Sequence, residues 1–155
     1  MQQARSVLVV GGGYAGLAFV RQLRRYDRKT PITLIDKNPY HTMLVESHQV
    51  AAGSRSAESI LLPFDQIDGV RFLRAEVLGG NLQARRLETT AGPVHYDRLV
   101  LALGSVDHDF AVPGVREHCQ TLRGLQDAVA IRDRLAALPP DEPLVIAGGG
   151  LTGVQ

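Results

Sequence analysis

Three glycines near the N-terminus follow a short apolar run at a spacing that suits phosphate chemistry. The run is Val7–Val10, and Gly11, Gly13 and Gly16 come directly after it in the order G-x-G-x-x-G. In this pattern the first glycine allows a tight turn, the second lets the backbone approach a pyrophosphate, and the third lets a helix pack closely on a strand. The N–H groups at the start of that helix then favour the phosphates, helped by the helix macrodipole.

An acidic residue stands where the ribose of a bound dinucleotide would lie. Asp36 comes 20 residues after Gly16 and directly after the apolar run Ile32–Ile35. A carboxylate at the end of a second strand can accept hydrogen bonds from the ribose hydroxyl groups. An acidic side chain here, without an arginine, disfavours a ribose that carries a 2′-phosphate.

A second glycine triplet lies near the C-terminus. Gly148, Gly150 and Gly153 repeat the same spacing after the apolar run Leu144–Ala147. Two such loops suggest two dinucleotides, which is what a flavoenzyme needs if it takes hydride from a nicotinamide. A glycine turn without a ligand stays open as the alternative for this second loop, because the sequence ends at Gln155, before the helix that should follow.

The elements that must position the first loop are those of a βαβ unit. Strand Val7–Val10, helix Leu17–Tyr26 and strand Ile32–Ile35 together have the length that such a unit requires. Farther along, short runs separated by glycine-containing turns predict the strands of an antiparallel meander: Val70–Arg74, Ala75–Leu78, Leu82–Thr89 and Val94–Tyr96, with turns at Gly79–Asn81 and Ala91–Pro93.

The later part of the chain returns to the pattern of buried strands. Leu99–Ala102 predicts a further parallel strand, and Leu125–Leu138 predicts an amphipathic helix that precedes strand Leu144–Ala147. The sequence therefore predicts the α/β class, with a Rossmann-like three-layer domain that contains an inserted antiparallel β-meander. We expect this domain to cover residues 1–112, and residues 113–155 to begin a second, truncated Rossmann domain after the Pro113-Gly114 linker.

Composition narrows the class of protein. The net charge is +1, from 17 Lys+Arg against 16 Asp+Glu, so the sequence gives no reason to expect a nucleic-acid partner. No apolar run approaches the roughly 18 residues that a membrane-spanning helix needs. Cys119 is the only cysteine of the sequence, which excludes a disulfide framework and a Cys-x-x-C metal or redox pair. These features favour a reducing, cytoplasmic compartment.

Several longer stretches resemble one superfamily, the FAD/NAD(P) pyridine nucleotide-disulfide oxidoreductases that bind two dinucleotides. The matching stretches are Val7–Gly16, Asp36–His41, His48–Gly53, Tyr96–Ser105 and Val145–Gly153. Within the superfamily the chain is most similar to type II NADH dehydrogenases, the single-subunit NADH:quinone oxidoreductases. The runs Asn-x-Tyr-His and Gln-Val-Ala-x-Gly favour this branch over the disulfide reductases, which carry a Cys-x4-Cys pair in this region that the sequence lacks.

The resemblance implies that FAD lies at the first glycine loop and that NAD(P)H lies at the second. Asp36 would hold the adenosine ribose, Lys37 would lie beside the adenine, and the backbone of Val77 would meet the adenine edge. Leu44–Ser47 would approach the isoalloxazine ring. The implied FAD contacts are Gly11, Gly13, Tyr14, Ala15, Gly16, Asp36, Lys37, Val77, Ala102, Leu103 and Gly104, and the implied NAD(P)H contacts are Gly148, Gly150 and Gly153.

The activity that the resemblance implies is hydride transfer from NAD(P)H through FAD to an acceptor, with a quinone favoured. It assigns no catalytic side chain and no metal ligand within this sequence. We expect residues 1–155 to be the N-terminal part of a longer protein, so that this part alone is inactive. The longer protein would contact the cytoplasmic face of the membrane through segments beyond residue 155, and a homodimer is compatible with the exposed surface of a truncated sheet.

Three other functions stay open from the sequence. Two are enzymes of the same superfamily, a sulfide:quinone reductase and a ferredoxin- or rubredoxin-type reductase. The third belongs to a different class, a non-catalytic module that binds a dinucleotide.

Overall fold

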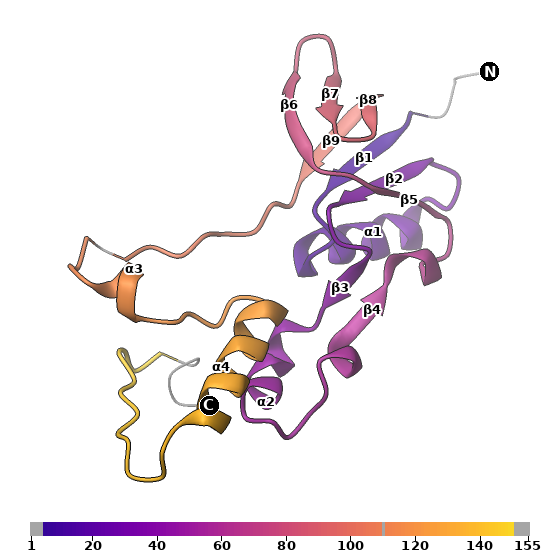
Figure 1. Ribbon diagram of the computed structural model, residues 1–155. Coiled ribbons are helices and arrows are strands. Elements are labelled where there is room, and N and C mark those ends of the chain that lie inside the picture. The colour runs from indigo at the N-terminus through magenta and orange to yellow at the C-terminus, as the bar shows by residue number, and fades with distance from the viewer. Residues whose placement is uncertain (1–4, 110, 151–155) are drawn as a thin grey trace. The chain divides into compact units, whose positions relative to one another are not determined.

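The computed structural model describes residues 5–109 and 111–150. Packing divides the chain into two compact units (Figure 1). The first unit is formed from Met1–His41 and Leu62–Ser105, and the second from Thr42–Leu61 and Val106–Gln155. Two short strands, β3 (Tyr40–Thr42) and β4 (Leu61–Pro63), pair with each other in a separate two-stranded sheet.

A parallel sheet of four strands is the centre of the first unit. Its strands stand in the order β5-β2-β1-β9, and all three pairings are parallel. Their bounds are β1 Val7–Val10, β2 Ile32–Asp36, β5 Val70–Arg74 and β9 Arg98–Leu101. All four residues of β1 are buried, because this strand has a neighbour on each side and a covering layer on each face.

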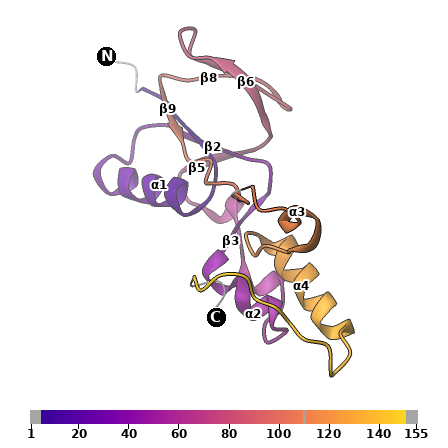
Figure 2. The same cartoon turned by 90° about the vertical axis from the view of Figure 1, so that its left-hand side faces the viewer.

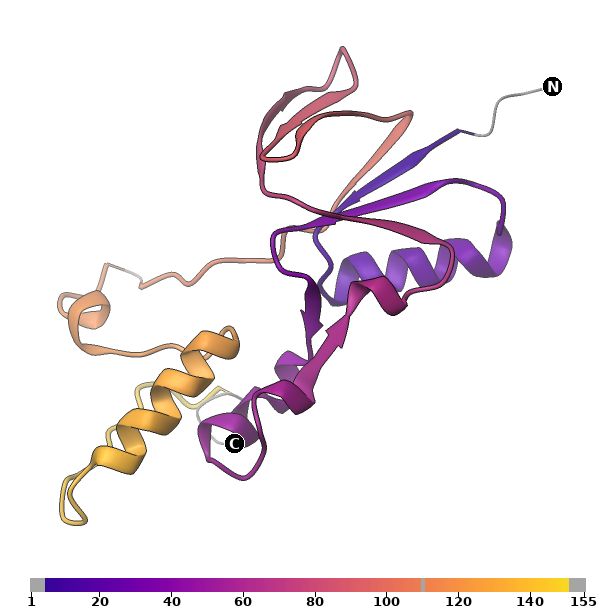
Figure 3. The same ribbon diagram turned by 45° about the vertical axis from the view of Figure 1, so that its right-hand side comes forward.

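Helix α1 (Tyr14–Tyr26) covers one face of this sheet (Figure 3). Its residue Val20 packs with Val7, Val9, Leu34 and other apolar side chains in a buried cluster. The helix begins three residues before the predicted start at Leu17, because Gly13 takes the N-cap position directly after the loop. Arg24 and Arg25 lie in its last turn, where positive charge suits the helix dipole.

An antiparallel meander covers the opposite face of the parallel sheet. It consists of β6 (Val77–Asn81), β7 (Arg86–Thr89) and β8 (Gly92–His95) in sequential order. Leu8 and Val10 of the parallel sheet share a buried cluster with Leu87 of the meander. The α/β class, the three layers and the inserted meander are therefore confirmed.

The predicted extent of the meander was wrong in three places. Gly92 and Pro93, predicted to lie in a turn at Ala91–Pro93, are the first two residues of β8. Val70–Arg74 pairs in parallel with β2, so it is an edge strand of the main sheet and no part of the meander. Its Val70 and Phe72 pack with the helix-side cluster, which explains this placement. In addition, residues 82–85 form a turn, whereas Gly79–Asn81, predicted as a turn, lies within β6.

The second unit is mainly helical. Helices α2 (Ser47–Ala51) and α4 (Leu125–Ala137) pack together (Figure 2) through Val50, Ala51 and Ala128, with Ile60 in the same cluster. Helix α4 confirms the helix predicted at Leu125–Leu138. The remaining short elements of the chain are α3 (Val115–His118) and the 3-10 turns η1 (Leu44–Glu46), η2 (Glu58–Ile60) and η3 (Phe64–Gln66).

The strand predicted at Leu144–Ala147 is wrong for the residues that the structure describes. This stretch has no regular secondary structure, and Val145 is 84% exposed. A strand needs a neighbour with which to exchange backbone hydrogen bonds. Within residues 5–109 and 111–150 no strand pairs with this segment.

Candidate dinucleotide-binding site

The loop between β1 and α1 lies at the carboxyl end of the parallel sheet, where open α/β sheets bind ligands. Gly11 opens it with a φ of +101°, in the left-handed region that favours glycine. A Cβ atom on Gly11 would lie 2.2 Å from the carbonyl oxygen of Ala102, directly after the neighbouring strand β9. The loop therefore turns against the end of β9 with no room for a side chain.

Gly13 and Gly16 differ in what surrounds them. Gly13 is exposed, and a Cβ atom built on it would meet nothing within 4 Å. Gly16 is buried, and its Cβ would lie 2.0 Å from the carbonyl oxygen of Gly11 and 3.4 Å from a methyl group of Val9. Gly13 thus faces open space, while Gly16 allows the helix to lie directly on the loop and on strand β1.

Asp36 is brought to the loop from the end of β2. Its Oδ2 accepts a hydrogen bond of 2.7 Å from the N–H of Gly12, and its Oδ1 accepts one of 2.8 Å from the N–H of Asn38. The carboxylate is half-buried, so it keeps a solvent-facing side from which ribose hydroxyl groups can reach it. Lys37, the next residue, is exposed.

Val77 comes three residues after the end of β5, which runs parallel to β2 and ends at the same edge of the sheet. The N–H of Ala75 donates to the carbonyl of Asp36 at 3.0 Å, which ties the end of β5 to the end of β2. Val77 follows two residues later, half-buried, as the first residue of β6.

The residues that follow β9 lie next to the glycine loop, beside Gly11. The N–H of Ala102 donates to the carbonyl of Val10 at 2.8 Å and so extends the β1–β9 pairing by one bond. Leu103 is 70% exposed, and Gly104 adopts a φ of +76°. The carbonyl oxygen of Ala102 and the nitrogen of Leu103 lie beside Gly11, at 2.2 and 3.5 Å from the position of a Cβ atom built on it.

Three residues of the site were not among the predicted contacts. Gly12 is buried, and its carbonyl oxygen lies 3.0 Å from Nδ1 of His41, which is itself 5% exposed. The ring of Phe64 fills the space beside Gly12, so that a Cβ on Gly12 would lie 2.0 Å from it. The Tyr-His run gave a signal for His41, whereas nothing in the spacing of the sequence pointed to Phe64.

The described residues do not form a site around the second glycine loop. Gly148 and Gly150 are exposed, and Cβ atoms on them would meet nothing within 4 Å. Gly153 lies outside the described residues. Leu44–Ser47, expected beside the flavin ring, contributes η1 and the start of α2, with the Ser47 hydroxyl donating to the Leu44 carbonyl at 2.6 Å.

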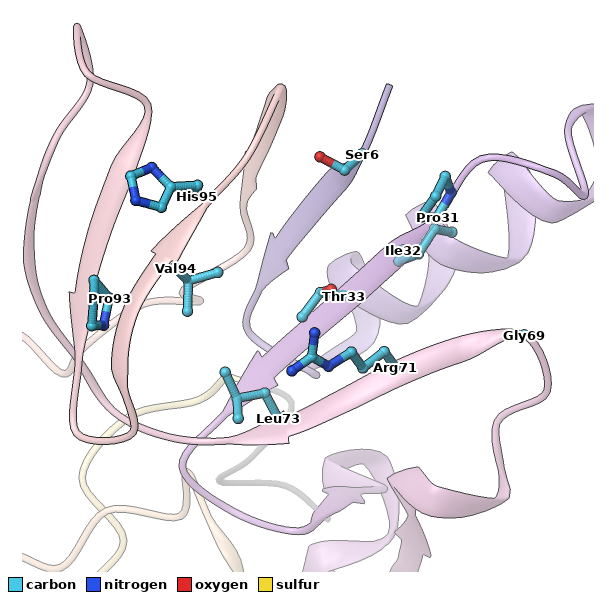
Figure 4. Close-up of a pocket in the computed structure, with 10 residues that line it drawn as sticks. All are labelled: Ser6, Pro31, Ile32, Thr33, Gly69, Arg71, Leu73, Pro93, Val94 and His95. Carbon is cyan, nitrogen blue, oxygen red and sulfur yellow. The ribbon is translucent and has the colours of Figure 1, made fainter. Parts of the chain in front are cut away.

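A separate cavity of about 550 Å³ opens between the parallel sheet and β8 (Figure 4). Thr33 and Arg71 line it from the parallel sheet, and Val94 and His95 line it from the meander. Three further lining residues come directly before strands β1, β2 and β5, namely Ser6, Pro31 and Gly69, and the lining is completed by Ile32, Leu73 and Pro93. This cavity is therefore at the amino ends of the strands, on the opposite edge from the glycine loop.

None of the helices in the described part of the chain is long and apolar enough to cross a membrane.

Comparisons with known proteins agree with this geometry. The chain is 33% identical to a type II NADH:quinone oxidoreductase of Staphylococcus aureus, over 99% of this chain and 42% of that protein. A sulfide:quinone oxidoreductase from Aquifex aeolicus superposes with a TM-score of 0.79 at 27% identity, covering 86% of this chain and 32% of that one. NDH2 from Plasmodium falciparum, solved in complex with NADH, superposes with a TM-score of 0.72 at 20% identity, covering 90% and 32%.

The chain thus spans less than half the length of these relatives. A family model described as pyridine nucleotide-disulphide oxidoreductase matches residues 5–155. Because the match covers nearly the whole chain, the protein belongs to the pyridine nucleotide-disulphide oxidoreductase family.

Proposed function

We propose that this chain supplies the FAD-binding part of an oxidoreductase that passes hydride from NAD(P)H through FAD to a quinone. The observation that carries the proposal is the glycine loop at the carboxyl end of β1, with Asp36 of β2 bonded to it through Gly12. The similarity to a type II NADH:quinone oxidoreductase along 99% of the chain supports the choice of donor and acceptor.

The residues present fit the ADP half of FAD. The open space before Gly13 allows a pyrophosphate to approach the backbone. Tyr14, Ala15 and Gly16 form the first turn of α1, whose N–H groups and dipole favour negative charge. Asp36 accepts hydrogen bonds from the ribose, and Lys37 and Val77 flank the adenine. Ala102, Leu103 and Gly104 line the cofactor on the side of β9.

FAD, when bound, supplies the redox chemistry, and the chain supplies orientation and electrostatics. The roles of the described residues are to bind the pyrophosphate, to hold the ribose and to keep the backbone close to the cofactor. We propose no catalytic side chain among them.

The second glycine loop is proposed to bind the phosphates of NAD(P)H through Gly148, Gly150 and Gly153. In this scheme residues 1–112 form the first segment of the FAD-binding domain, and residues 113–155 begin the domain for the nicotinamide nucleotide. The whole protein would be cytoplasmic and associate with the cytoplasmic face of the membrane.

A sulfide:quinone oxidoreductase is the second candidate. The superposition on the Aquifex aeolicus enzyme, with a TM-score of 0.79 and 27% identity, favours it. We rank NADH above sulfide as the electron donor because the identity to the NADH:quinone oxidoreductase is 33% over 99% of this chain, against 27% over 86% for the sulfide enzyme.

The experiment compares electron donors in the protein as its gene encodes it. Reduction of a water-soluble quinone is followed with NADH, NADPH or sulfide as donor, together with the flavin content of the purified protein. We expect bound FAD and quinone reduction with NADH. Flavin with sulfide as the only effective donor would favour the second candidate, and a protein that binds dinucleotide but in which none of the three donors reduces a flavin would be a non-catalytic module.

The residue-level assignment is tested with Asp36→Ala. We expect the variant to lose FAD on purification, because the ribose loses its acceptor. The matched control is Asp68→Ala, which removes an exposed carboxylate shortly before the amino end of β5, at the opposite edge of the sheet from the loop. Equal flavin content in the parent and in Asp36→Ala would contradict the role given to Asp36.

A further inference from the structure

Three side chains hold Gly12, one at its N–H, one at its carbonyl oxygen and one beside its Cα atom. The N–H of Gly12 donates to Asp36, its carbonyl oxygen lies 3.0 Å from Nδ1 of His41, and the Phe64 ring fills the space beside its Cα atom. These three residues come from different parts of the chain, at the end of β2, within β3 and in η3. Gly12 is therefore fixed more firmly than the exposed Gly13 that follows it.

The hydrogen bond from His41 has a defined direction. A carbonyl oxygen only accepts, so Nδ1 of His41 carries the proton and donates it. The imidazole is 5% exposed, and the ring of Tyr14 meets it edge-on with the ring centroids 4.6 Å apart. Burial and this aromatic contact together restrict the imidazole to the orientation in which Nδ1 faces Gly12.

Fixing the carbonyl of Gly12 also fixes the N–H of Gly13, because both belong to one planar peptide. In a trans peptide the C=O and N–H bonds point in opposite directions. His41 lies on the carbonyl side, so the Gly13 N–H points away from it. That N–H donates to no described residue, and the space around Gly13 is open.

We propose that His41 is a positioning residue that aims the Gly13 N–H at the pyrophosphate of the bound dinucleotide. This inference rests on the proposed function, since it needs a pyrophosphate at the first glycine loop. His41 touches no reacting atom in this account, because it acts through the Gly12 peptide. The ligand class that depends on it is therefore one with a diphosphate, whereas the adenosine part alone does not depend on it.

The test titrates the purified chain with ADP, which carries the diphosphate, and with adenosine, which lacks it. We expect His41→Leu to weaken ADP binding about tenfold, the effect of misaligning one hydrogen bond to a charged phosphate. Adenosine affinity should change by less than about twofold, since Asp36 still serves the ribose. The matched control is His95→Leu, which removes an exposed histidine on β8 and should leave both affinities unchanged.

A second pair of variants keeps the test decisive if His41→Leu fails to fold. The amide nitrogen of asparagine occupies the place of Nδ1, whereas that of glutamine occupies the place of Nε2. His41→Asn should therefore retain ADP affinity, and His41→Gln should lose it. Parent-like ADP binding by a folded His41→Leu or His41→Gln, or equal losses for ADP and adenosine, would overturn the positioning role. If the parent itself binds no ADP, the proposed function fails first.

Discussion

Gly11, Gly13 and Gly16 share one motif but meet different surroundings. Cβ atoms at Gly11 and Gly16 would collide with backbone carbonyl oxygens at 2.2 and 2.0 Å, whereas Gly13 has open space around it. Gly13 also has a φ of −72°, which any residue can adopt. The fold therefore requires glycine at two positions of the motif, Gly11 and Gly16, and we assign the third, Gly13, to the proposed ligand.

This difference predicts opposite outcomes for two alanine substitutions. Gly16→Ala should lower the free energy of unfolding by about 3 kcal/mol or more, because its methyl group meets backbone that cannot move aside cheaply. Gly13→Ala should cost about 1 kcal/mol or less, since it only replaces one N-cap residue with a poorer one. Its methyl group should instead weaken ADP binding, because it occupies the approach to the loop.

Urea unfolding measures the free energy of unfolding of both variants. Titration of Gly13→Ala with ADP then measures its affinity for the diphosphate. Equal stability losses for the two variants would contradict the assignment of Gly13 to the ligand. ADP affinity unchanged in Gly13→Ala would do the same.

The sequence could give the glycines and Asp36, because their roles follow from spacing along one βαβ unit. It could not give Phe64, which reaches Gly12 from a turn that lies far along the chain. Such a contact depends on how η3 packs, and no local pattern records that packing.

At the scale of elements, side-chain hydrogen bonds join the starts of two neighbouring strands of the first unit that are far apart in the sequence. Ser6 and Asp97 come just before the neighbouring strands β1 and β9. The Asp97 carboxylate accepts hydrogen bonds of 2.8 Å from both the backbone N–H and the hydroxyl of Ser6. These bonds, the backbone one first, lower the pKa of Asp97 below its usual 3.8.

The lowered pKa of Asp97 predicts how its hydrogen bonds with Ser6 contribute to stability as the pH falls. A carboxyl group whose pKa is lower in the folded chain than in the unfolded chain stabilises the fold above its unfolded pKa. That contribution is lost as the pH falls below 3.8 and through the lower pKa of the folded state. Asp97→Asn should therefore lose less stability than the parent between about pH 5 and pH 2.

Urea midpoints measured across this range test the prediction. Asp65→Asn serves as control, because its exposed side chain makes no hydrogen bond to the described residues. If the urea midpoints of the parent and of Asp97→Asn change with pH in the same way, the hydrogen bonds from Ser6 to Asp97 do not contribute to the pH dependence of stability.

Strand and helix patterns in the sequence identified most elements but not their partners. Val7–Val10 and Ile32–Ile35 are strands as predicted, the second one residue longer, because apolar β-branched runs suit a sheet buried on both faces. Val70–Arg74 was correctly predicted as a strand but wrongly placed in the meander. Alternation along a strand says which face is buried, and it carries no information on which neighbour the strand joins.

At the scale of the whole molecule, the two glycine loops have different surroundings. The first lies between β1 and α1 and is bonded to Asp36 at the end of β2, all within one unit. The second follows an exposed stretch that pairs with no strand among residues 5–109 and 111–150. The chain also covers 42% of the Staphylococcus aureus relative, so a complete enzyme of that kind is longer.

We therefore predict that residues 1–155 alone bind ADP but do not oxidise NADH. The first loop has its supporting elements, whereas the described residues form no sheet beside the second loop that could hold a nicotinamide nucleotide near a flavin. NADH absorbance in the presence of added FAD and a soluble quinone checks this. Steady NADH consumption by the purified chain would contradict it, and a control with heat-denatured chain corrects for reaction without protein.

The most direct test of the account is anaerobic titration of the complete gene product with NADH, followed by the visible absorbance of its flavin. The account predicts that the purified protein contains FAD and that about one equivalent of NADH removes the absorbance of the oxidised flavin. Addition of a quinone should then restore that absorbance. A complete protein that contains no flavin, or whose flavin NADH leaves oxidised, would contradict the central claim.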